Sequence, residues 1–354
     1  MNLSVSHLIM SRGCYSSPIF SGNVRFSLVE SGFNNFFHSI AYLHHCTNLI
    51  RKCRFSLFLN RVILMEKQNF HKLAINQRIL LVEQTSIQEC TFKGITNSEI
   101  GACFNIDISG VAIELKKCRF YSCKSSSSCG AFFVGSLCTK LDFHQCCFTN
   151  CEASSTHNCI VSCPSEIMFL MSFMCANTIN GQYGTIYVKH KPTLISDINS
   201  TKNLILHHGS GLWIENSNGV YVSRVINFGC VSKGVLVMLN SPNSVIEYLS
   251  MINNTCTLDG ILWLDGAVTY KKSTFFNNTS AFLNSPSLAT FSDCTFDYSS
   301  LSGPNFIGVN LFSKKQVLSI EYPGESMCND PHTAWKSIYT SSYISLFMIR
   351  VILQ

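Results

Sequence analysis

Hydrophobic residues occur along this chain in short runs that recur at a nearly constant distance. A Cys-x-Phe signal appears three times in succession, at Cys90–Phe92, Cys118–Phe120 and Cys146–Phe148, in steps of 28 residues. Two more cysteines, Cys123 and Cys151, each lie five residues after the first cysteine of their own unit. A period of this length is typical of solenoids, in which each repeat forms one turn of a stack.

The apolar position of this signal, which is Phe in the first three repeats, recurs downstream, mostly without the preceding cysteine. Aligning it with Phe92, Phe120 and Phe148 predicts that one column continues through Phe173, Ile198, Val225, Met251, Phe275 and Phe296. A second apolar run follows each first one, at residues 101–104, 130–134, 158–161, 184–188, 211–214, 234–238 and 260–264. These runs are four to five residues long, rich in Val, Ile, Phe and Tyr, and bounded by Gly, Asn or Ser, which is typical of strands and too short for helices.

Two strand-like elements in each repeat of one coil's length predict an all-β fold, a single right-handed parallel β-helix of about eight to ten coils. The repeats span residues 85–310. Residues 1–84 are expected to form irregular early coils and a cap, and residues 311–354 a C-terminal cap or tail, because terminal repeats are atypical. Stacked Cys and Phe side chains would fill the core, in columns formed by Cys90, Cys118, Cys146, Cys123, Cys151, Phe92, Phe120, Phe148 and Phe173.

The order Cys-x-Phe, then Asn, then Gly-Ala and two apolar residues resembles the parallel β-helix repeats of polymorphic outer membrane proteins. It is also similar to cysteine-rich repeat families of this kind in parasitic protists. Gly101–Ala102 and Gly130–Ala131 match the second motif in part, and later repeats replace the alanine. The resemblance covers residues 85–310 and implies a surface or secreted protein with an adhesive or structural role. It implies no catalytic residues.

The chain has 19 cysteines, which disulfides or buried thiols could explain. Neighbouring cysteines of one column would be about 5 Å apart with parallel side chains, a poor geometry for bonding, so free thiols are favoured there. In an oxidising compartment, Cys118 with Cys123 and Cys146 with Cys151 are the preferred pairs, and Cys159 could also pair with Cys163. No Cys-x-x-Cys occurs, and we expect no metal and no cofactor.

Composition excludes some functions. The net charge is +6 and the Lys and Arg residues are scattered, so no nucleic-acid partner is expected. Acidic residues total 20 and rarely align between repeats; Asp259 and Asp265 come nearest to a carboxylate pair and are favoured as turn residues. Trp213 and Trp263 could stack on sugars, but their different distances from the preceding glycine predict opposite orientations, so packing in the core or a cap is favoured for both.

Asn199, Asn253 and Asn277 are in Asn-x-Ser/Thr sequons. They could carry glycans, or Asn253 and Asn277 could instead form a side-chain stack at a bend. Residues 337–353 are apolar but short for a membrane span, and a cap strand or a truncated remnant is favoured over an anchor. The N-terminus shows no signal-peptide pattern.

The leading hypothesis is a non-enzymatic surface or secreted protein that binds a host-cell or matrix protein or a glycan. The alternatives are a carbohydrate-active β-helix enzyme and a degenerate or truncated structural member of the family without a ligand.

Overall fold

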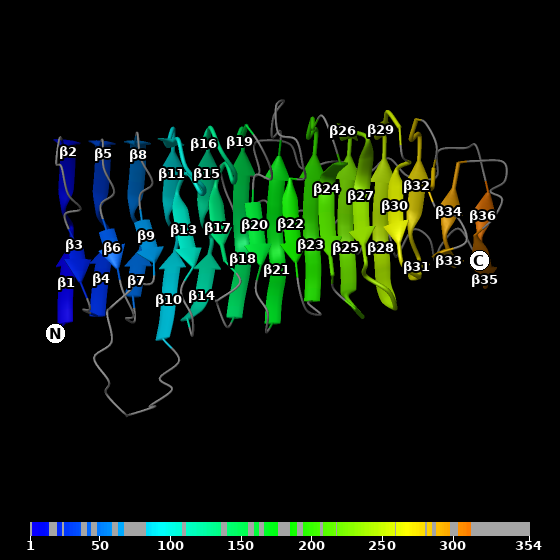
Figure 1. Ribbon diagram of the computed structural model, residues 1–354, viewed down its shortest axis with the longest axis horizontal. Coiled ribbons are helices and arrows are strands. Elements are labelled where there is room, and N and C mark those ends of the chain that lie inside the picture. The colour runs from blue at the N-terminus through cyan, green and yellow to red at the C-terminus, as the bar shows by residue number, and fades with distance from the viewer. Residues whose placement is uncertain are drawn as a thin grey trace, which may run out of the picture.

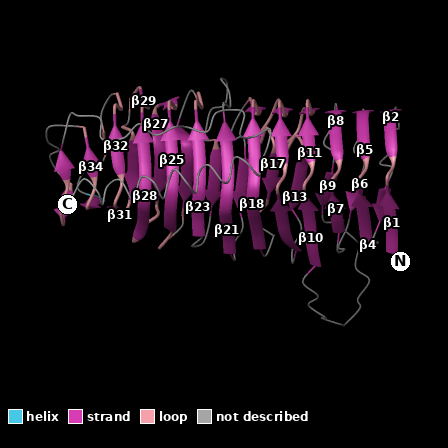
Figure 2. Ribbon diagram, turned by 180° about the vertical axis from the view of Figure 1, so that it is seen from behind, coloured by secondary structure: helices cyan, strands magenta, loops and turns pink. Residues whose placement is uncertain are grey.

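The computed structural model describes residues 2–13, 20–22, 25–36, 41–43, 48–58, 63–66, 83–107, 111–135, 140–154, 159–162, 166–175, 185–189, 194–205, 208–216, 218–258, 260–279, 282–284, 288–297 and 304–312. Every element named in this part of the chain is a strand, and every strand pairing is parallel. Figure 2 shows these strands running side by side, with loops between them. The predicted fold class, an all-β parallel β-helix, is confirmed.

Sheet A has 21 strands and forms two sides of the stack. Strands before its bend are β1 (Asn2–Ser6), β4 (Arg25–Val29), β7 (Asn48–Arg51), β10 (Glu83–Gln88), β14 (Val111–Lys116), β31 (Val268–Lys271), β33 (Ala289–Ser292) and β35 (Asn305–Ile307). Strands after the bend are β2 (Ile9–Gly13), β5 (Gly32–Phe36), β8 (Arg54–Phe58), β11 (Thr91–Lys93), β15 (Arg119–Tyr121), β32 (Thr274–Phe276), β34 (Thr295–Phe296) and β36 (Leu311–Phe312). Both sides are joined in β18 (Lys140–Thr149), β21 (Glu166–Cys175), β23 (Leu194–Thr201), β25 (Tyr221–Phe228) and β28 (Ser244–Ile252).

Sheet B provides the return path of each coil. Its strands are β3 (Phe20–Gly22), β6 (Ala41–Leu43), β9 (Ile63–Glu66), β13 (Phe104–Asp107), β17 (Phe132–Val134), β20 (Cys159–Ser162), β22 (Ile186–Lys189), β24 (His208–Glu215), β27 (Gly234–Leu239) and β30 (Leu262–Asp265). Two small sheets lie between A and B: sheet C with β12 (Thr96–Asn97), β16 (Lys124–Ser125) and β19 (Glu152–Ala153), and sheet D with β26 (Val231–Ser232) and β29 (Thr255–Cys256).

The β-helix extends beyond the part of the chain in which the sequence repeats are clear. From β10 to β35 the pairings of sheet A pass through ten strands: β10, β14, β18, β21, β23, β25, β28, β31, β33 and β35. Before them, β1, β4 and β7 add three more in the same parallel arrangement. The N-terminal region is therefore part of the β-helix, and β1 and β36 lie at opposite ends of it (Figure 1).

The phenylalanine column forms where the sequence signal is complete. Phe92 pairs with Phe55 on one side and Phe120 on the other, and Phe120 pairs with Phe148. Consecutive rings along Phe33, Phe55, Phe92, Phe120 and Phe148 are stacked, with centroids 4.7–5.6 Å apart. All five are at most 1% exposed, so they form the axis of the N-terminal half of the core.

Phe173, predicted to continue this column, is not in it. An irregular register between β18 and β21 pairs Phe173 with Cys147, and Phe148 with Met174. From Met174 the column passes through Ser200 and Asn227 to Met251, and returns to phenylalanine at Phe275 and Phe296. Ile198 and Val225 belong instead to the column of Cys146, through Ser172. The prediction chose the nearest apolar residue, whereas the structure places Ser200 and Asn227, both fully buried, in the core.

Candidate functional site

Cysteines occupy one column of the core, which runs through Cys53, Cys90, Cys118 and Cys146, and each of them follows a bend in the backbone. Lys52, Glu89, Lys117 and Gln145 have φ values of 53°, 55°, 54° and 54°, in the left-handed region that few non-glycine residues adopt. The residues directly after them are Cys53, Cys90, Cys118 and Cys146. Such a bend turns the chain from one side of sheet A to the other and takes the next N–H out of the regular strand pairing.

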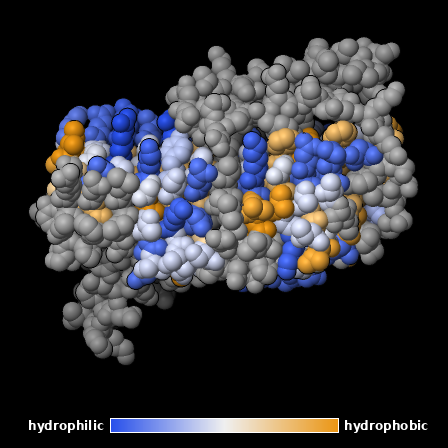
Figure 3. Space-filling model, turned by 90° about the horizontal axis from the view of Figure 1, so that it is seen from above, coloured by the Kyte–Doolittle hydropathy of each residue, from blue (hydrophilic) through white to orange (hydrophobic). Residues whose placement is uncertain are grey.

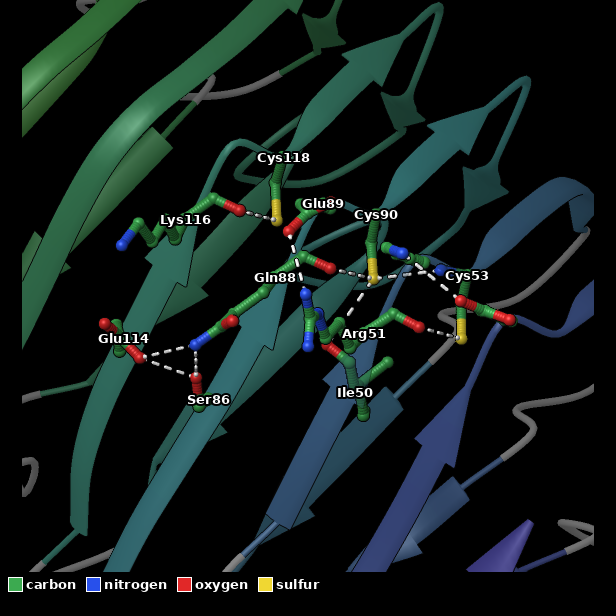
Figure 4. A network of polar contacts seen from close by, with 12 residues as sticks. Ile50, Arg51, Cys53, Ser86, Gln88, Glu89, Cys90, Glu114, Lys116 and Cys118 are labelled. Atoms are coloured by element: carbon green, nitrogen blue, oxygen red, sulfur yellow. Dashed lines mark hydrogen bonds and ion pairs between the residues drawn. The ribbon is translucent and has the colours of Figure 1, made fainter. Parts of the chain in front are cut away.

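At Cys53, the thiol of the next coil accepts this N–H. The amide nitrogen of Cys53 donates to Sγ of Cys90 at 3.4 Å. The single S–H of Cys90 has two carbonyl acceptors within reach, Gln88 O at 3.1 Å from Sγ and Ile50 O at 3.6 Å. Figure 4 shows these thiols in one row, each directed at the backbone of its own bend. The cysteine therefore satisfies backbone groups that the bend leaves unpaired, which buried polar groups require.

Serine and asparagine replace cysteine in this role. At the same bend, Ser31 Oγ accepts from the Leu8 amide, and Ser273 Oγ accepts from the Leu249 amide. Each coil also has a second bend. In two successive coils this bend contains Cys123 and Cys151, whose thiols donate to Phe92 O and Phe120 O respectively. Later coils use asparagine at the second bend. Asn254 Oδ1 accepts from the Cys230 amide at 2.9 Å, and Asn278 Oδ1 accepts from the Asn254 amide at 3.0 Å.

The thiols of both bends are buried and reduced. Cys90, Cys118, Cys123, Cys146 and Cys151 have thiols rather than disulfides and are 0% exposed, so the within-coil pairs suggested for an oxidising compartment are not formed. Burial raises the pKa of the Cys123 and Cys151 thiols well above the usual value.

Cys147, on the outer side of β18, is disulfide-bonded. Cys159 belongs to β20, and Cys163 lies outside the described residues. We interpret the buried columns as structural.

A different set of residues faces outward on sheet B. Strand pairing places Trp213 beside Tyr187 on one side and Val237 on the other, and Val237 beside Trp263. Trp213 and Trp263 therefore lie in one column, two coils apart, and the predicted opposite orientation is wrong. The prediction compared the distance of each tryptophan from its preceding glycine, but Gly211 and Gly260 are not at equivalent positions. The reason is the irregular register of β24 between His208 and Leu212. We call Tyr187, Trp213 and Trp263 the aromatic column.

The aromatic column has polar neighbours at hydrogen-bonding distance. Tyr187 Oη donates to Glu215 Oε2 at 2.7 Å, and Lys189 Nζ is 3.5 Å from Glu215 Oε1. The Tyr187 and Trp213 rings meet edge to face, with centroids 6.0 Å apart. Burial, and then the hydrogen bond to the Glu215 carboxylate, raises the pKa of Tyr187 far above its usual value, so it is a hydrogen-bond donor at neutral pH. Trp213 is 7% exposed, and Trp263 is partly exposed.

The sequence did not single out Tyr187, Lys189 or Glu215. A usable signal was present, because Tyr187 and Trp213 both occupy the middle of an apolar-aromatic-apolar triplet, Ile186–Val188 and Leu212–Ile214. Anchoring the repeats on these triplets rather than on glycine would have aligned the two aromatic residues. It would also have placed Lys189 beside Glu215, as the strand pairing does.

The three predicted glycosylation positions differ in their surroundings. Asn199 is 1% exposed, so a glycan attached there would have no room, and this prediction is wrong for the folded chain. Asn253 and Asn277 are exposed at bends, with φ of 54° and 47°. Asn277 Nδ2 donates to Asn253 Oδ1 at 2.7 Å, which forms the side-chain stack considered from the sequence. Glycosylation of Asn253 and Asn277 stays a prediction.

Other chemistry has little support in the described parts of the chain. They contain no group of three or more His, Cys, Asp or Glu side chains placed to hold a metal ion. Asp265 is exposed at the end of β30, whereas Asp259 lies outside the described residues, as does the apolar segment 337–353. No helix among the described residues is long and apolar enough to cross a membrane.

Comparison with known proteins adds only a distant structural likeness. No protein-family model matches the chain, and no curated protein matches it. Among solved structures, it is similar to the receptor-binding protein of bacteriophage Det7, a podoviral tailspike in a myovirus. The identity is 9%, the match covers 84% of this chain and 75% of that one, and the TM-score is 0.24. A likeness at this level carries no argument about function.

Proposed function

We propose that this chain is a non-enzymatic surface or secreted repeat protein that binds a ligand along its side. The observation that supports the proposal is the alignment of Tyr187, Trp213 and Trp263 in one outward column of sheet B. Outward positions on a solenoid do not contribute to the stacked core, so the fold alone does not require three large aromatic side chains there. Tyr187 and Trp263 are partly exposed, and aromatic residues with polar neighbours on a surface are enriched among residues that dominate binding.

The neighbours of the aromatic column suit a glycan or a protein surface. Glu215 provides carboxylate acceptors and Lys189 provides ammonium donors beside the rings. Tyr187 and Trp263, both partly exposed, are separated by three coils, or roughly 15 Å, so an extended ligand lying along the axis could contact both positions. We propose host-cell or matrix proteins and glycans as the partner classes.

The test is direct binding of the purified full chain to panels of immobilised glycans and matrix proteins. We expect Trp263→Ala to weaken the binding found by about tenfold or more, the effect of removing an aromatic anchor. Tyr221→Ala is the matched control. Tyr221 lies on the outward face of sheet A, is 41% exposed and donates to Glu247 at 3.0 Å, as Tyr187 donates to Glu215.

Two results would contradict the proposal. Equal losses in Trp263→Ala and Tyr221→Ala would show that the aromatic column is not the binding surface. Release of reducing ends from a polysaccharide panel, with or without Ca²⁺, would show that the protein is an enzyme.

A further inference from the structure

Two short basic sequences occupy the same bend of sheet A, two coils apart. Residues 51–54 have the sequence Arg-Lys-Cys-Arg and residues 116–119 the sequence Lys-Lys-Cys-Arg. Strand pairing places position 88 between positions 51 and 116, and position 91 between positions 54 and 119. The six cations therefore form two triplets at equivalent places, although 61 residues of chain separate the last of one from the first of the other. We call them the basic ridge: Arg51, Lys52, Arg54, Lys116, Lys117 and Arg119.

The basic ridge lies at the surface and is only partly neutralised. Its members are exposed or partly exposed. Arg51 Nη2 is 3.6 Å from Glu89 Oε1, as Figure 4 shows, and Lys52 Nζ is 3.2 Å from Glu30 Oε1. Six cations against these two carboxylates leave an excess of four positive charges.

The second triplet and Arg54 form no ion pair with any residue that the structure describes. In Figure 4, Lys116 extends away from the thiol column. The nearby carboxylate of Glu114 accepts hydrogen bonds from Ser86 and Gln88. Two coils correspond to roughly 10 Å, about one Debye length at ordinary ionic strength, so both triplets attract the same polyanion.

The residues between the triplets restrict the kind of polyanion. Gln88, Glu89 and Thr91 occupy the intervening coil, at the positions equivalent to the cations. Glu89 repels an anion, whereas its carboxylate accepts a hydrogen bond from a hydroxyl group. The best partner therefore alternates anionic groups with hydroxyl groups along its length.

A linear acidic polysaccharide has this alternation. The distance of two coils is close to the length of a disaccharide in an extended chain. A membrane surface and an acidic peptide present negative charge without intervening hydroxyl groups, and the basic ridge has no aromatic side chain on which nucleic-acid bases could stack. Polar surface continues elsewhere on the molecule: on the face seen from above in Figure 3, hydrophilic residues form rows and the apolar groups between them are small.

We propose that the basic ridge binds a linear acidic polysaccharide lying along the axis of the β-helix. Arg54 and Arg119 would bind its sulfate or carboxylate groups through their guanidinium forks. Glu89 and Thr91 would contact the hydroxyl groups between them. The proposal does not rest on the function proposed for the aromatic column, which lies on sheet B.

Binding of the purified full chain to heparin, which is sulfated, and to polygalacturonate, which has carboxylates only, tests the ridge. In Lys116→Gln/Lys117→Gln/Arg119→Thr we expect the affinity to fall about tenfold or more, with a weaker dependence on salt, because three cations are lost. The variant should fold, because neighbouring coils have the same residue types at the equivalent positions, namely Gln88, Gln145 and Thr91.

A matched control removes the same charge from other coils. Lys202→Gln/Lys271→Gln/Lys272→Gln should leave the affinity for both polysaccharides nearly unchanged. Glu89→Gln tests the intervening coil. It removes the repulsion between the triplets, so it should raise the affinity for polyglutamate, which has no hydroxyl groups, more than the affinity for heparin.

Four outcomes would overturn the proposal. Equal losses in the two triple variants would show that net charge alone causes the binding. The unmodified chain could bind neither polysaccharide. It could bind polyglutamate, duplex DNA or vesicles of an anionic phospholipid as tightly as the better polysaccharide. Finally, Glu89→Gln could change the affinities for polyglutamate and heparin equally, which would remove the reason for choosing a polysaccharide.

Discussion

At the scale of single residues, the repeated cysteine acts as a hydrogen-bonding group. A bend with positive φ removes one backbone N–H from the regular pairing, and the side chain one coil further along accepts it. Cys90 does this for Cys53, Ser31 for Leu8 and Asn254 for Cys230. Cysteine, serine and asparagine share the two requirements of small size and a polar atom close to the backbone. This explains why later coils lose the cysteine and keep the architecture.

Replacement of Cys90 tests this role. We expect Cys90→Ala to lower the free energy of unfolding by about 1–3 kcal/mol, because the Cys53 N–H becomes a buried donor without an acceptor. Cys90→Ser should lower it less, because Oγ can accept the same N–H as Ser31 and Ser273 do. Urea denaturation measures both, with exposed Lys93→Ala as the control. Equal losses for alanine and serine would show that Cys90 contributes through packing alone.

At the scale of elements, the strands were predictable and part of their register was not. Phe92, Phe120 and Phe148 could be aligned because the cysteine two residues earlier fixes the position after the bend. At Ser200 and Asn227 the column holds polar residues that a search for apolar positions rejects. Their burial depends on contacts within a coil and between coils. Ser200 Oγ donates to Ser210 O, and Asn227 Nδ2 donates to Met251 Sδ at 3.1 Å. The aromatic column was missed for a related reason, since Gly211 was taken as equivalent to Gly260.

The same packing explains why position 211 is a glycine. A Cβ atom there would be 2.2 Å from Asn227 Oδ1, and Asn227 is fully buried and cannot move into solvent. We expect Gly211→Ala to lower the melting temperature, with a loss of about 1–3 kcal/mol from overpacking. Adding Asn227→Ser should recover part of the loss by making room.

Gly32→Ala is the control for this prediction, because nothing lies within 4 Å of a Cβ atom at Gly32. Equal melting temperatures for Gly211→Ala and Gly32→Ala, measured by thermal denaturation, would show that Asn227 does not restrict position 211.

At the scale of the whole molecule, two buried thiols, those of Cys230 and Cys294, link stability to alkaline pH. Burial raises the pKa of Cys230 and of Cys294 from 9.0 to about 11. Below pH 9 these thiols are protonated in both the folded and the unfolded chain, and their contribution is complete. Between pH 9 and 11 the unfolded chain loses the protons that the folded chain retains, so unfolding becomes more favourable as pH rises.

We expect each thiol to lower the free energy of unfolding by about 1.4 kcal/mol between roughly pH 8 and pH 10. Cys230→Ser and Cys294→Ser should each remove their share, because serine does not ionise in this range. Urea denaturation of the chain and of the two variants at both pH values provides the measurement. The same loss in all three proteins would mean that other groups cause the alkaline decrease.

The unequal length of the coils has a consequence for how such a chain can change over time. The step between paired residues is 37 from Phe55 to Phe92, 28 from Phe92 to Phe120 and 15 from Phe291 to Phe306, yet the rings stay aligned. Register depends on a few residues at each bend, so the segments between bends are free to lengthen or shorten. Insertions, deletions and duplications of whole coils can therefore accumulate without loss of the axis, and each new segment can present a new outer surface on an unchanged frame.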